Sequence, residues 1–222
     1  MCPKGHTCAA GTIAPTPCPV GTYNPSYGQT ECLPCPPGFF CDELGMSDDT
    51  FLLQDKQCYA GYYCPDLGTD ATSPAATGNT VPNAVICPEG HYCLTGSATP
   101  TICEKGYYEP REGSDACQEC PAGYYCPLAI SVDPFTGIAS DPSTTPIICV
   151  LGYCEAGSWQ PALCPDGSFS NSTLKMMASA EECLPCPLGY YCNQGIKQGL
   201  CDAGYFCDFG AKDFRDVSKI CP

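Results

Sequence analysis

Aliphatic and phenylalanine side chains, which build most hydrophobic cores, are scarce in this sequence. Leu, Ile, Val and Phe together make up about 16% of its 222 residues, below the roughly 20% under which a highly charged chain is expected to be disordered. The net charge of −15 adds to that expectation. The composition therefore excludes one large hydrophobic core, so a folded chain needs another source of stability.

Basic residues are also few, with nine Lys and Arg against 24 Asp and Glu. Such a surface repels nucleic acid and anionic lipid, so we expect neither as a partner. No run of about 18 apolar residues occurs, and we expect no membrane insertion within this segment. Met1 is followed directly by Cys2, Pro3 and Lys4 and not by an apolar leader, which favours a mature product or part of a longer chain.

The two histidines, His6 and His91, occupy the same position of a sequence repeat, which favours a structural ring over a catalytic base. No motif places a nucleophile beside a base and an orienting group. We therefore expect no enzyme and no cofactor.

Cysteine is abundant, with 23 residues, or about one residue in ten, which marks a disulfide scaffold. Disulfides hold small units that lack a hydrophobic core, and they persist outside the cell. The 23 Gly and 24 Pro favour turns and short hairpins over helices. We therefore expect an extracellular or cell-surface location.

The sequence repeats itself. Residues 2–41 align with residues 87–126 without a gap, with 18 of 40 positions identical and all six cysteines in register. The unit is C-x5-C-x9-C-x13-C-x2-C-x5-C, and a looser third copy spans 149–192. Shorter elements of the form C-x2-G-aromatic-aromatic-C begin at Cys58 and Cys201. Cys221-Pro222 resembles the opening of one more element, so Cys221 is expected to pair in a longer array or with another chain.

Each element is interpreted as a short hairpin or turn clamped by cystine, because Gly permits a tight turn and the aromatic pair can pack on the disulfide. Six cysteines allow 15 pairings. The preferred pairs close the 13- and 18-residue loops: Cys18–Cys32, Cys103–Cys117 and Cys164–Cys183. Zinc is the rival for the C-x2-C pairs Cys32/Cys35, Cys117/Cys120 and Cys183/Cys186, but a second knuckle or histidine pair is missing.

The segments Cys18-Pro19-Val20-Gly21-Thr22-Tyr23 and Cys32–Cys41 resemble the ephrin-receptor-like cysteine-rich module, with related patterns in growth-factor-receptor and tumour-necrosis-factor-receptor families. The match recurs at 103–126 and 164–192. The resemblance implies a small disulfide-rich fold that serves as a spacer, adhesive stalk or ligand-binding ectodomain.

The spacers are rich in Ser, Thr and Pro, which suits O-glycosylation or an unmodified polar loop. Candidate O-glycosylation sites are Thr72, Ser73, Thr77, Thr136, Ser143, Thr144 and Thr145. Asn171 begins the N-glycosylation sequon, in the loop inserted in the third copy. The acidic residues Asp42, Glu43, Asp48 and Asp49 are interpreted as a solvated linker, with calcium binding as the alternative.

The fold class expected is small and disulfide-rich: tandem cysteine-rich modules of short β-hairpins and turns, little helix, in an elongated rod. The expected order is cysteine-rich unit 1 (1–41), a spacer with a short C-x5-C element (42–86), unit 2 (87–126), a Ser/Thr/Pro-rich spacer (127–148), unit 3 (149–192), and a short element with the start of another (193–222).

The function expected is structural: a glycosylated fibre, stalk or coat segment that self-associates end to end or continues in a longer array. The alternative is a receptor ectodomain that binds a protein ligand through a segment unlike its repeat counterparts. Candidates are Leu174, Lys175, Met176 and Met177, and the segment Phe51-Leu52-Leu53.

Overall fold

The computed structural model describes residues 1–47, 56–65, 84–127, 131–132, 139–140, 144–170 and 176–221. These residues form two compact bodies. The first body consists of Met1–Ile102 and Arg111–Cys117, and the second of Cys103–Pro110 and Gln118–Pro222.

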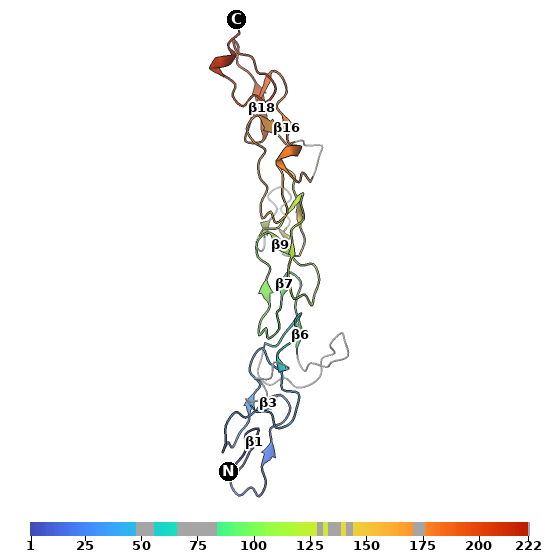
Figure 1. The fold of residues 1–222 in the computed structure, drawn as a ribbon, viewed down its shortest axis with the longest axis vertical. Helices are drawn as coiled ribbons and strands as arrows, with labels where there is room; N and C mark the ends of the chain where they lie inside the picture. Colours follow the sequence, from blue (N-terminus) through green and yellow to red (C-terminus); the bar gives the residue numbers. More distant parts are fainter. Residues whose placement is uncertain are drawn as a thin grey trace. The chain divides into compact units, whose positions relative to one another are not determined.

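The first body contains four antiparallel hairpins of two-residue strands, which follow one another in chain order (Figure 1). The pairs are β1 (His6–Thr7) with β2 (Thr16–Pro17), β3 (Thr22–Tyr23) with β4 (Leu33–Pro34), β5 (Tyr62–Tyr63) with β6 (Val85–Ile86), and β7 (His91–Tyr92) with β8 (Thr101–Ile102).

The second body continues the pattern and adds two 3-10 helices, η2 (Ala180–Glu182) and η3 (Val217–Lys219). Its pairs are β9 (Tyr107–Tyr108) with β10 (Gln118–Glu119), β11 (Tyr124–Tyr125) with β14 (Ile147–Ile148), β12 (Ser131–Val132) with β13 (Ala139–Ser140), β15 (Ser168–Phe169) with β16 (Leu184–Pro185), and β17 (Tyr190–Asn193) with β18 (Ile196–Leu200). The predicted class of short hairpins with little helix is confirmed.

The hairpins place the aromatic pair of each element opposite the residues that precede the next cysteine. Tyr62 faces Ile86 and Tyr63 faces Val85, and Tyr124 faces Ile148 in the second body. Cross-strand aromatic–aliphatic pairs of this kind stabilise antiparallel strands by about 0.2–1 kcal/mol each. Since a lone two-stranded hairpin is marginal in water, the cross-links must supply the rest.

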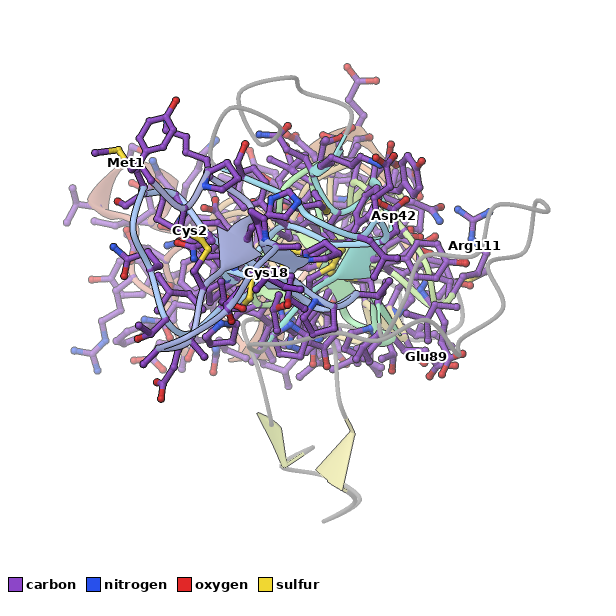
Figure 2. The ribbon with its side chains drawn as sticks, turned by 90° about the horizontal axis from the view of Figure 1, so that it is seen from below. Met1, Cys2, Cys18, Asp42, Glu89 and Arg111 are labelled. Atoms are coloured by element: carbon purple, nitrogen blue, oxygen red, sulfur yellow. A yellow bond between two sulfur atoms is a disulfide. The ribbon has the colours of Figure 1, made fainter. Side chains whose placement is uncertain are left out.

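The interior is built of cystine. Among the described residues, 21 hydrophobic side chains are buried and 17 of them are cysteines, so the disulfides themselves are the core. The exceptions are Phe40, Met46, Ala84 and Met177. Figure 2 shows the Cys2 and Cys18 sulfur atoms among packed side chains, with Asp42, Glu89 and Arg111 at the margin. The scarcity of aliphatic residues is thereby explained.

Candidate functional site

All cysteines of the chain lie in the described residues, and all but Cys221 are disulfide-bonded. Two of the three expected long-loop pairs are present, Cys18–Cys32 and Cys164–Cys183. Cys103 and Cys117 are each disulfide-bonded, and their mutual pairing stays a prediction. The remaining bonds close loops within single elements: Cys2–Cys8, Cys35–Cys41, Cys58–Cys64, Cys87–Cys93, Cys120–Cys126, Cys149–Cys154, Cys186–Cys192 and Cys201–Cys207.

This connectivity bears on the zinc alternative. Cys32 and Cys35, which form a C-x2-C pair, belong to two different disulfides, with Cys18 and Cys41. Zinc binds thiolates, and neither sulfur is a thiolate in this arrangement.

Backbone hydrogen bonds tie each element to the next. An element here means an opening cysteine, the glycine three residues later and the closing residue after the aromatic pair. The Gly61 N–H donates to the Cys93 carbonyl of the following element, and the Gly61 carbonyl accepts from the N–H of Cys87, which opens it. The first of these bonds recurs within each body at 2.8–3.0 Å, from Gly5 to Asn24, Gly21 to Cys41, Gly38 to Cys64, Gly106 to Cys126, Gly123 to Cys154, Gly167 to Cys192 and Gly189 to Cys207.

The element glycines also bring two backbones into contact. At Gly61, which has φ +83°, an added Cβ would lie 2.3 Å from the Gly113 carbonyl oxygen. The same approach occurs at Gly38, where the oxygen of Gly96 is 2.4 Å away. Only glycine fits both the positive φ and this distance. Each element therefore contacts the next element and also a loop beyond it, which makes an interlocked ladder.

The loops that complete this ladder carry a residue in the left-handed conformation, and its N–H donates back to an opening cysteine. Gly96, for example, donates to the Cys58 carbonyl. In the third copy Met176 takes this position with φ +70°, and it donates to Cys149. Met177 behind it is 1% exposed, and its carbonyl accepts from Cys154. The two methionines that the sequence offered as a binding segment thus complete the scaffold.

Replacing Met176 with glycine is expected to stabilise the second body by about 0.5–1 kcal/mol. An L-residue in the left-handed conformation costs roughly 1–2 kcal/mol, and glycine removes this cost. Glycine also makes the unfolded chain more flexible, which cancels part of the gain in stability. The matched variant Met177→Ala should instead destabilise by about 2–4 kcal/mol, because it empties a buried site. Hydrogen exchange of the Cys149–Cys154 amides measures both, and a loss of protection in Met176→Gly would contradict the assignment.

Polar side chains close the elements that lack a closing cysteine. Asn24 is 1% exposed, and its amide donates to the carbonyls of His6 and Glu31. Glu109 is fully buried and accepts from Gln118. The sequence interpretation missed both residues, although aligning the elements on their glycines places Asn24 and Glu109 where Cys41 closes its own element.

The acidic residues weighed as a linker or a calcium site have a basic partner. The Lys56 ammonium lies 2.6 Å from Asp42 and 2.9 Å from Glu43, and 5.7 Å from the Phe40 ring centre. Burial lowers the pKa of Lys56, but the hydrogen bonds and attraction from the two carboxylates outweigh it and raise the pKa above its ordinary value. Asp42 and Glu43 are exposed and form ion pairs with Lys56, which is compatible with the solvated linker expected at these two residues. Asp48 and Asp49 lie outside the described residues.

The two histidines adopt the same geometry. His6 and His91 each donate from Nδ1 to the carbonyl oxygen two residues earlier, Lys4 and Glu89, at 3.0 Å. Both rings lie in the first strand of a hairpin, β1 and β7. This agrees with the structural ring position that the repeat suggested.

Most predicted glycosylation sites fall outside the described residues: Asn171, Thr72, Ser73, Thr77, Thr136 and Ser143. So do Phe51-Leu52-Leu53, Leu174 and Lys175. Thr144 is half-buried and Thr145 is exposed. Their modification stays a prediction.

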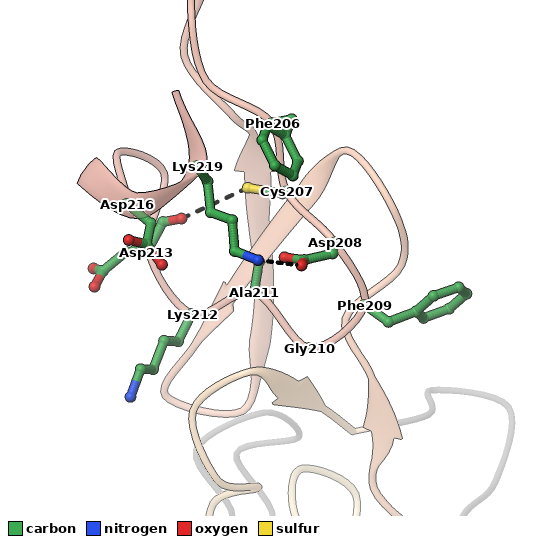
Figure 3. A pocket seen from close by; sticks show the side chains of 10 residues that line it. All are labelled: Phe206, Cys207, Asp208, Phe209, Gly210, Ala211, Lys212, Asp213, Asp216 and Lys219. Carbon is green, nitrogen blue, oxygen red and sulfur yellow. Dashed lines mark hydrogen bonds and ion pairs between the residues drawn. The ribbon is translucent and has the colours of Figure 1, made fainter. Parts of the chain in front are cut away.

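Beside η3, the second body has a hollow of about 160 Å³ (Figure 3). Phe206 and Phe209 line it together with Asp208 and Lys219. The Lys219 ammonium donates to Asp208 at 2.6 Å, which lowers the pKa of Asp208 and raises that of Lys219. The hollow is therefore braced by an internal ion pair.

Cys221 itself occupies a regular ladder position. Its N–H donates to the Gly204 carbonyl at 2.9 Å, as Cys87 does to Gly61 in the first body and Cys201 to Gly189 in the second. Its thiol is free and exposed.

The comparison with known families agrees with this architecture. Residues 1–49 match the family model described as tyrosine-protein kinase ephrin type A/B receptor-like. Residues 1–49 are thus similar to an ephrin-receptor-like module, and the chain repeats their cysteine pattern. The matched segment covers the first three elements and their loops.

Similar segments occur in much longer proteins. The chain is 27% identical over 143 residues to the Sushi, von Willebrand factor type A, EGF and pentraxin domain-containing protein 1 of Rattus norvegicus, matching 54% of the chain and 4% of that protein. It is 28% identical over 121 residues to the signal peptide, CUB and EGF-like domain-containing protein 3 of Mus musculus, 54% of the chain and 9% of that protein.

A third relative is the putative white-brown complex homolog protein 30 of Arabidopsis thaliana, 31% identical over 115 residues, 47% of the chain and 9% of that protein. The chain therefore spans less than a tenth of each of these relatives. The disulfides, which persist in oxidising environments, and the similarity to the first two relatives place this protein outside the cell or at its surface. In the part of the chain that the structure describes, no helix has the length and apolar character needed to cross a bilayer.

Proposed function

We propose that this array is a structural spacer of an extracellular or cell-surface protein, a stalk, fibre or coat segment without enzymatic activity. The observation that carries the proposal is the ladder within each body, in which successive elements are joined by two backbone hydrogen bonds, as at Gly61, Cys87 and Cys93. Most of the buried hydrophobic side chains of the described residues are disulfide-bonded cysteines, which maintain the scaffold.

The order of the disulfides supports a mechanical role. Each disulfide in the described elements closes before the next one opens, as in Cys35–Cys41 followed by Cys58–Cys64. Force applied along such a chain passes through the covalent loops in series. The residues inside a loop stay locked until its own bond breaks.

Single-molecule pulling tests the proposal. Without reductant we expect extension only by the residues outside the loops. With reductant under constant force, each six-residue separation should release roughly 15 Å, Cys18–Cys32 roughly 45 Å and Cys164–Cys183 roughly 60 Å, at about 3.5 Å per residue. The alkylated, fully reduced chain is the control. If the oxidised chain extends by the same length as this control, the proposed mechanical role is wrong.

The proposal includes glycans on the spacers and end-to-end association. For a fibre, the sedimentation coefficient should rise with protein concentration, whereas a stalk stays monomeric.

The second candidate is a receptor ectodomain that binds a protein ligand. The observation that favours it is the single tryptophan of the chain, Trp159, which is 44% exposed in a loop where the ladder does not require it.

A further inference from the structure

Trp159 stands at a ladder position that is filled elsewhere by small or polar residues. It follows Gly157 and Ser158, whose carbonyl accepts from the Cys126 N–H. Loops with the same hydrogen bond place other residues there: Ala98 after Ser97, Asp115 after Ser114, Ala178 after Met177 and Lys212 after Ala211. The scaffold therefore forms without a large aromatic side chain at this point.

The element before this loop is also irregular. The sequence separation of Cys149 and Cys154 is five. The other disulfides of this kind close C-x5-C elements and have a sequence separation of six. Departure from the repeat and an exposed tryptophan thus coincide. Aromatic residues of this kind dominate the energetics of protein interfaces.

A cation already lies on the indole face. The Lys105 ammonium is 4.6 Å from the centre of the Trp159 ring. The two segments are held together beneath it, because an added Cβ at Gly106 would lie only 2.4 Å from the Gly157 carbonyl oxygen. The contact with Lys105 therefore identifies the face of the Trp159 ring as a place where a positive charge binds.

The two segments that meet at Gly106 and Gly157 carry aromatic and acidic side chains. Tyr107 is 43% exposed and pairs across the hairpin with Glu119. A Glu119 carboxylate oxygen lies 2.9 Å from the point that a Cβ on Gly157 would occupy, and Glu119 is exposed. Glu104 and Glu155 are exposed beside Lys105 and at the start of the Trp159 loop. Three carboxylates thus accompany one ammonium, which complements a basic partner.

We propose that Trp159, Tyr107 and Glu119 form a docking surface for a basic segment of a partner protein. An arginine side chain of the partner takes the place of Lys105 on the Trp159 face and pairs with the Glu119 carboxylate. A guanidinium combines stacking on an aromatic ring with fork-like pairing to a carboxylate, so this chemistry favours arginine over lysine. The net charge of −15 steers such a partner toward the chain. The surface is separate from the spacer role, since the ladder does not depend on Trp159.

Because Trp159 is the only tryptophan, its fluorescence reports this surface directly. The probe is a synthetic peptide of alternating arginine and leucine, titrated into the oxidised protein, with binding also measured by calorimetry. We expect saturable binding with a change in tryptophan emission. A peptide with lysine in place of arginine should bind more weakly. A peptide with glutamate in place of arginine should not bind.

Variants distinguish this site from general attraction to an acidic protein. Trp159→Ala should weaken binding at least about tenfold, as expected of an interface hot spot, and Glu119→Gln should weaken it severalfold. Lys105→Gln should strengthen binding, because the internal competitor is gone. Phe209→Ala, at an aromatic side chain 67% exposed elsewhere in the same body, is the matched control and should change nothing.

Lys105→Gln should raise the binding affinity, whereas a variant that misfolds would lower it. The two explanations are therefore distinguishable. Equal binding by the wild type and Trp159→Ala, with only salt reducing it, would overturn the proposal. So would emission changes caused by a neutral oligosaccharide or by dimerisation without the arginine peptide.

Discussion

Complete reduction of the disulfides is expected to unfold both bodies at room temperature. Cysteines make up 17 of the 21 buried hydrophobic side chains of the described residues, so reduction breaks the bonds and leaves thiols and four other side chains as the core. Each loop closure contributes roughly 2–3 kcal/mol in the chain-entropy model, and a few of them exceed the 5–15 kcal/mol net stability of a typical domain.

Near-UV circular dichroism and amide chemical-shift dispersion measure this effect before and after reduction and alkylation. Mass spectrometry supplies the control: the oxidised protein should take up one alkyl group, at Cys221, and the reduced protein 23. Native dispersion in the fully alkylated chain would show that packing other than cystine holds the fold.

Replacing Gly61 with alanine is expected to destabilise the first body by about 2–5 kcal/mol. The left-handed backbone alone costs roughly 1–2 kcal/mol, and relief of a backbone clash typically costs 1–3 kcal/mol more. The clash is with the Gly113 carbonyl oxygen, 2.3 Å from the new Cβ. Amides on either side of the contact, Cys93 and Gly113, should exchange faster with solvent because both hydrogen-bond within this ladder step.

Gly204→Ala is the matched control. Gly204 holds the same element position with φ +90°, but within the described residues nothing lies within 4 Å of the added Cβ. Its cost should be limited to the roughly 1–2 kcal/mol of the backbone conformation. Similar losses of protection in the two variants would mean that the close approach contributes nothing.

The cysteine spacing was sufficient to locate the C-x5-C elements, because each of these loops is closed by its own disulfide. It also favoured Cys18–Cys32 and Cys164–Cys183, which the structure contains. These inferences needed only residues close in sequence.

The ladder could not be predicted in the same way. The bond from Gly61 to Cys93 joins residues separated by a spacer, and its existence depends on how the backbone folds back on itself. Lys56 shows the same limit, since it pairs with Asp42 and Glu43, 14 and 13 residues away. The sequence interpretation missed Trp159 because it relied on the cysteine spacing. Trp159 stands out only once the ladder is known, since small or polar residues take the same position in other loops.

The serial arrangement of short disulfide loops has a consequence for biogenesis. In most elements a cysteine meets its partner six residues later, so the bond can form soon after the second cysteine emerges into an oxidising lumen. Each closed loop removes its two thiols before distant competitors are synthesised. The chain can therefore oxidise vectorially from its N-terminal side, and a gene that gains or loses one element leaves the disulfides of the others undisturbed.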